Sequence, residues 1–70
     1  MLREINYTEI KWNVNNPMEK KVAEEIANAI QKYGKVVVKE KIIAKGTFIN
    51  IYAYDRNLYR NILVSSIQII

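Results

Sequence analysis

Apolar positions in residues 55–70 recur at steps of one, three and four, which is the spacing of one face of an α-helix. The stripe consists of Leu58, Tyr59, Ile62, Leu63, Ser66, Ile67 and Ile70. Asp55 stands just before it, where an N-terminal cap is expected. The pattern therefore predicts a helix over residues 55–70. A strand is the alternative, because β-branched residues are frequent and a second set of positions alternates. That set is Ile62, Val64, Ser66, Gln68 and Ile70.

Residues 16–34 carry clear signals of an earlier helix. Asn16 can cap it, Pro17 suits its first position, and Glu19 stands three residues after Asn16, as in a capping box. Gly34 follows as a C-terminal stop. The expected apolar stripe is Met18, Val22, Ile26, Ala29, Ile30 and Tyr33, extended by the small residues Ala23 and Ala27.

Alternating positions predict three strands. The first covers residues 10–14, where Ile10, Trp12 and Val14 alternate with polar residues. Ile5 and Tyr7 have the opposite parity, so either a bulge near residues 8–9 or two short strands are expected there. Residues 35–44 and 47–54 predict a hairpin around a tight turn at Lys45-Gly46.

The predicted fold class is α+β, in a single domain of residues 1–70. We expect a two-layer sandwich in which a three-stranded antiparallel sheet has two helices on one face, in the order β-α-β-β-α. A domain of 70 residues has a small core and gains stability from disulfides, metals or association. The chain has neither cysteine nor histidine, so association with a partner or with itself is the expected route.

The net charge is +4, from eleven Lys and Arg residues and seven Asp and Glu residues, which suits an anionic partner without requiring one. No apolar run is long enough for a membrane span, and the polar N-terminus does not resemble a signal peptide, so a cytoplasmic protein is expected. The abundance of Ile, Lys, Glu, Asn and Tyr indicates an AT-rich genome, and a thermophilic source is expected on the same ground.

The chain offers little catalytic chemistry. It has one Asp, two isolated glycines and no His or Cys, so we expect neither an enzyme, nor a metal site, nor a cofactor. Glu24 and Glu25 are adjacent on a helix and point in different directions.

Lysines and aromatic residues share the sheet face that should lie opposite the helices. They are Lys39, Lys41 and Lys45 beside Phe48, Asn50, Tyr52 and Tyr54. Single-stranded nucleic acids bind such faces, because bases stack on the rings while lysines meet phosphates. Exposed strands also favour these residue types for structural reasons. RNA binding through this face is therefore the alternative function.

The second candidate surface is helical, and it carries a family resemblance. Asp55, Arg60 and Ser65, separated by the apolar residues Tyr59, Leu63 and Ile67, follow a hydrophobic strand. This run and the element order resemble the Pcc family, the small dimerisation subunit of the KEOPS complex. Val64 and Ser66 depart from the Asn and Phe that are frequent in that family, so resemblance to a divergent paralogue of this subunit is the alternative.

The resemblance implies a non-catalytic scaffold. Pcc subunits form homodimers by joining their sheets, and their helices contact the catalytic subunit that installs threonylcarbamoyl on adenosine of tRNA. The residues expected to bind that partner are Ala23, Ala27, Arg60, Leu63 and Ile67. A small regulatory protein of a virus or plasmid, with its own fold, is a third interpretation.

Overall fold

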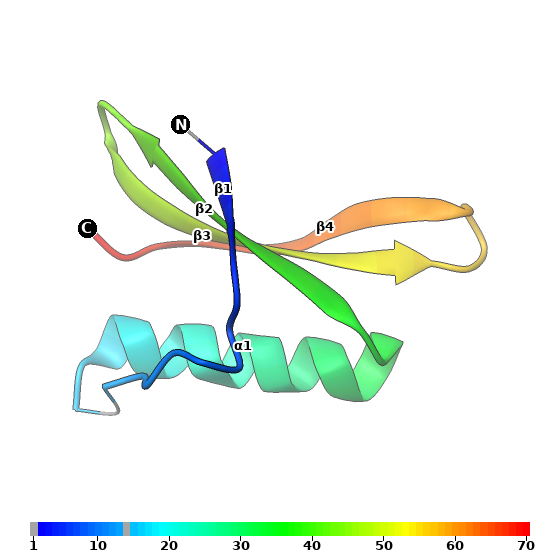
Figure 1. The fold of residues 1–70 in the computed structure, drawn as a ribbon, viewed down its shortest axis with the longest axis horizontal. Coiled ribbons are helices and arrows are strands. Elements are labelled where there is room, and N and C mark those ends of the chain that lie inside the picture. The colour runs from blue at the N-terminus through cyan, green and yellow to red at the C-terminus, as the bar shows by residue number, and fades with distance from the viewer. Residues whose placement is uncertain (1, 14) are drawn as a thin grey trace.

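The computed structural model describes residues 2–13 and 15–70. Its elements, in order, are β1 (Leu2–Ile5), α1 (Pro17–Tyr33), β2 (Val36–Ile43), β3 (Gly46–Asp55) and β4 (Arg60–Gln68). The strands form one antiparallel sheet in the order β1-β2-β3-β4, and α1 lies along one face of it (Figure 1). The α+β class with two layers agrees with expectation. The predicted order β-α-β-β-α, with three strands and two helices, is wrong, because the last element is a strand.

A β-bulge interrupts the alternation of residues along the last element. Ile51 pairs with Ser65 and the next residue, Tyr52, pairs with Leu63, so Val64 is an extra residue in β4. A bulge changes which face successive residues point to. The positions of the predicted helical stripe therefore come from both sides of β4: Ile62 and Ile67 lie opposite the core residues Ala53 and Ile49, whereas Leu63 and Ser66 lie opposite Tyr52 and Asn50 on the other side.

Asp55 is a capping residue, but it caps a turn rather than a helix. Its Oδ1 accepts hydrogen bonds from the backbone N–H groups of Asn57, at 2.7 Å, and Leu58, at 3.1 Å. A helix N-cap uses the same contacts, two and three residues ahead. Here they close the four-residue turn between β3 and β4, which ends at Tyr59 with a positive φ of 53°. A left-handed residue stops helical propagation, and the chain returns as β4.

The start and end of α1 are as predicted. Asn16 Oδ1 accepts hydrogen bonds from the N–H groups of Met18, at 3.0 Å, and Glu19, at 3.4 Å, and Pro17 begins the helix. The reciprocal bond of a capping box is replaced, because Asn16 N–H donates to the carbonyl of Asn13. Gly34 ends the helix with a φ of 90°.

The prediction of a strand beginning at Ile10 is wrong, and its last residue, Val14, lies outside the described residues. The strand is β1, which ends at a turn where the Glu9 N–H donates to the carbonyl of Asn6. The ring of Trp12 packs against the core without any strand pairing. Its alternation with polar neighbours reflects partial burial of an extended segment.

The core lies between α1 and one face of the sheet. Its fully buried members are Val22, Ile26, Ala29, Val36, Val38, Ile49, Ile51, Ala53 and Ile67. The β2–β3 hairpin is confirmed, although its turn consists of Ala44 and Lys45, between the paired residues Ile43 and Gly46. Since α1 is the one helix among the described residues, the other sheet face has no helix packed on it.

Candidate nucleic-acid interface

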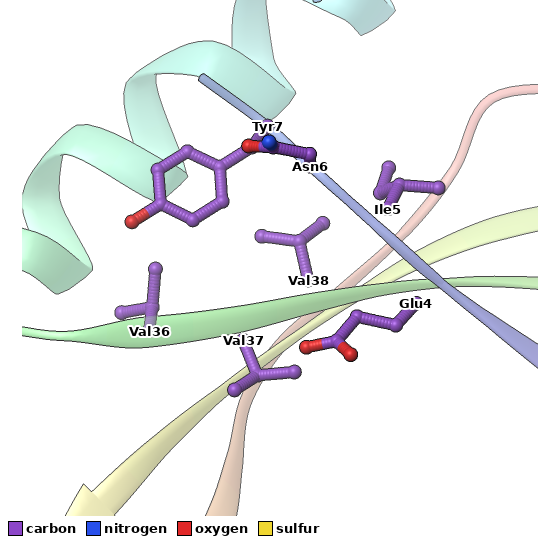
Figure 2. A pocket seen from close by; sticks show the side chains of 7 residues that line it. All are labelled: Glu4, Ile5, Asn6, Tyr7, Val36, Val37 and Val38. Atoms are coloured by element: carbon purple, nitrogen blue, oxygen red, sulfur yellow. The ribbon is translucent and has the colours of Figure 1, made fainter. Parts of the chain in front are cut away.

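The sheet places the predicted lysines and aromatic residues on the face that points away from α1, here called the open face. Figure 2 shows Val36 and Val38 pointing toward α1, and Val37 pointing to the opposite side. In the β2–β3 register, Val37 lies opposite Tyr52. Since strand residues alternate between faces, the open face carries Lys39, Lys41, Phe48, Asn50, Tyr52 and Tyr54. The remaining predicted residue, Lys45, lies in the β2–β3 turn beside this face.

A short hydrogen-bonded chain holds the centre of the open face. Ser66 Oγ donates to Asn50 Oδ1 at 2.6 Å, and Asn50 Nδ2 donates to the hydroxyl of Tyr52 at 3.4 Å. Asn50 is only 7% exposed, although it faces away from α1. The ammonium of Lys39 lies 5.3 Å from the centroid of the Tyr52 ring, within cation–π range. The Tyr52 side chain therefore contacts an amide through its hydroxyl and a lysine through its ring.

The positive charge of the molecule belongs to the strands that build this face. The helix α1 contains three acidic and three basic residues, whereas residues 34–70 hold six basic residues and two acidic ones. The net charge of +4 therefore comes entirely from residues 34–70. The two acidic residues there are already engaged: Glu40 pairs with Arg3 at 2.7 Å, and Asp55 caps the β3–β4 turn.

The six basic side chains of residues 34–70 form no ion pair with a described acidic residue. Within residues 2–13 and 15–70, no ion pair involves Lys35, Lys39, Lys41, Lys45, Arg56 or Arg60. Glu4 of β1 is the cross-strand neighbour of Lys39 and brings one negative charge to the open face. This face thus carries more lysines than acidic residues, together with aromatic rings, and proteins that bind single-stranded nucleic acids combine these two features.

The residues predicted to bind a protein partner do not form one surface. Ala23 and Ala27 lie on α1, while Leu63 lies on the open face, opposite Tyr52. Arg60 begins β4 beside the turn. Ile67 is 5% exposed and belongs to the core, so its side chain is not available for contact with a partner.

Strand β4 supplies residues that the sequence did not assign to this face. Asn61 lies opposite Tyr54, and Ser66 lies opposite Asn50. The predicted helix over residues 55–70 hid Asn61 and Ser66, because the residues of a helix do not pair with a strand of the sheet. The alternative reading of that segment as a strand contained the necessary signal, but the bulge at Val64 breaks its parity.

A hollow of about 320 Å³ lies where β1 separates from β2 (Figure 2). The Glu4 carboxylate lies on one side of the β2 edge and Tyr7 on the side of α1, so these two groups do not converge. In the part of the chain that the structure describes, no three acidic residues come together as a metal site, and α1 is too short and too polar to cross a membrane. Comparisons with protein-family models, with curated proteins and with solved structures find no match to this chain.

Proposed function

We propose that this protein binds single-stranded nucleic acid through the open face. The observation that carries the proposal is the placement of Lys39 and Lys41 beside Tyr52 and Phe48 on neighbouring strands, with no helix over them. Lysines at this spacing can meet successive phosphates while the rings accept stacked bases. Stacking requires bases that are not already paired, so a single strand or an RNA loop is the expected ligand rather than a duplex.

The charge distribution supports the same ligand. The basic excess lies in the three-stranded part of the sheet, whereas α1 is balanced, so an anionic polymer is attracted to one side of the molecule. The Lys39 ammonium over Tyr52 supports it further, because it holds a cation next to the ring on which a base would stack. Phosphate and base contacts would then be made by adjacent groups.

The scaffold role that the Pcc resemblance implies stays a prediction. The segment that carries the resemblance forms the β3–β4 turn and β4, so the expected contact helix is replaced by a strand. A partner subunit would have to bind another surface, and tRNA contact through the open face is compatible with either role.

The test is fluorescence anisotropy with labelled RNA and DNA strands of about 12 nucleotides, a length within the range that small binding domains cover. We expect binding at ~50 mM salt that weakens about 20-fold by ~200 mM, because three phosphate contacts at about 0.7 counterions each give that dependence. The double variant Lys39→Glu/Lys41→Glu should bind at least ~10-fold more weakly at ~50 mM salt, since two of those contacts are lost.

The matched control is Lys20→Glu/Lys21→Glu, which changes the net charge equally on exposed residues of α1. It should retain most of the affinity. Equal losses of affinity in the two double variants would show that net charge alone attracts the nucleic acid. That result would overturn the role of the open face. Absence of binding by the parent protein at ~50 mM salt would refute the proposal.

A further inference from the structure

We infer that the open face contains a binding site for one nucleobase, here called the base site, at its end near the β3–β4 turn. This inference rests on the proposed function. A hollow of about 220 Å³ opens there. Its lining residues are Lys35, Val37, Tyr52, Ala53, Tyr54 and Asn61. The lining thus includes two tyrosines, a lysine, an asparagine and two aliphatic residues.

The two tyrosines are spaced for a planar guest. Tyr52 and Tyr54 are two residues apart on β3, which separates their positions by about 6.7 Å, roughly twice the ~3.4 Å spacing of stacked bases. The hydroxyl of Tyr52 is hydrogen-bonded to Asn50, on the side away from Tyr54, so its ring leans out of the interval. Tyr54 is 49% exposed and can turn its ring toward a base. One base can enter between them.

Polar groups flank this interval on both neighbouring strands. Asn61 lies directly opposite Tyr54 on β4, and Lys35 lies on the other side, just before β2. Neither side chain has a hydrogen bond or an ion pair to another described residue. An asparagine amide offers one donor and one acceptor side by side, which matches the N6 and N7 edge of adenine. Lys35 can bind the phosphate of the nucleotide whose base occupies the base site.

Tyr54 provides the direct test of the base site. The indole introduced by Tyr54→Trp should be quenched when an adenine strand of about 12 nucleotides binds, whereas Trp12, packed against the core beneath the sheet, gives a constant background. Tyr54→Ala should weaken binding about 5- to 100-fold, the range of one lost base–aromatic stack. The matched control is Tyr59→Ala, in the β3–β4 turn, where an 81% exposed ring lies outside the hollow. It should leave the affinity unchanged.

Asn61 provides the test of base identity. The parent protein should bind an adenine strand at least ~5-fold more tightly than a uracil strand, and Asn61→Ala should remove that preference while leaving the uracil affinity within about twofold. If binding depends on Lys39 and Lys41 but not on Tyr54, the base site is refuted and the proposed function stands. If the parent protein binds no strand, both are refuted. Circular dichroism of each variant should show the parental fold.

Discussion

Replacing Gly46 by alanine should destabilise the protein far more than the same change at Gly34. Gly46 begins β3 with a φ of 140°, in the region that side chains rarely adopt. A Cβ built on Gly46 would collide with the backbone oxygen of Ile70 and come within 2.7 Å of Gln68 Nε2. Gly34 also has a positive φ, of 90°, but a Cβ there would meet no atom within 4 Å. Alanine at Gly34 therefore introduces backbone strain alone, whereas alanine at Gly46 introduces both backbone strain and a steric clash.

The structure gives the expected size of the effect. Strain from the disfavoured φ costs about 1–3 kcal/mol at either glycine. At Gly46 the collision would also displace the last residues from the β2–β3 turn. Gln68 Nε2 donates to the carbonyls of Lys45 and Ile70, at 3.0 Å each, and Thr47 N donates to Ile70 O at 3.3 Å. Losing two such bonds costs about 2 kcal/mol. We expect about 3–5 kcal/mol for Gly46→Ala and about 1–3 kcal/mol for Gly34→Ala.

Urea unfolding followed by circular dichroism measures both free energies of unfolding. A domain of this size has about 4–10 kcal/mol to lose, so Gly46→Ala should shift the midpoint strongly. Equal losses in the two variants would show that the contact with Ile70 contributes nothing. A loss below about 0.5 kcal/mol for Gly46→Ala would refute the strain and the contact together.

Two further substitutions test the core and the corrected turn. Ile51 is completely buried at the centre of β3, so Ile51→Ala should lower the free energy of unfolding by about 2–5 kcal/mol, while Leu58→Ala in the exposed turn should stay within about 0.5 kcal/mol. Asp55→Ala should cost about 1 kcal/mol and speed amide hydrogen exchange at Asn57 and Leu58, and Asp55→Asn, which keeps an acceptor, should cost less. Unchanged exchange in Asp55→Ala would contradict the cap.

The elements with local signals were predictable. A cap at Asn16, a proline after it and Gly34 at the end define α1 without reference to the rest of the fold. The β2–β3 hairpin follows from two runs rich in β-branched and aromatic residues, joined by a short turn. Each of these patterns is interpreted within a single element, so tertiary packing did not have to be known.

The C-terminal segment could not be assigned in this way. Both of its signals were ambiguous, because Asp55 makes the same two hydrogen bonds in a turn as in a helix cap, and the bulge at Val64 replaces alternation by a mixed spacing. What decides for the strand is pairing with β3, a non-local interaction. The candidate site shows the same division: the alternation along β2 and β3 was enough to group Lys39 with Tyr52, but not to find Asn61.

The strand β4 changes the open face as well as the fold. With a helix in its place, β3 would be an edge strand, and Tyr52 and Tyr54 would stand at the border of a three-stranded sheet. As built, β3 is an inner strand, with Leu63 opposite Tyr52 and Asn61 opposite Tyr54. The aromatic residues thus gain neighbours on both sides, and the hydrogen bond from Ser66 holds Asn50 beneath the Tyr52 hydroxyl. A ring positioned in this way would lose less freedom on stacking with a base, which would favour the proposed binding.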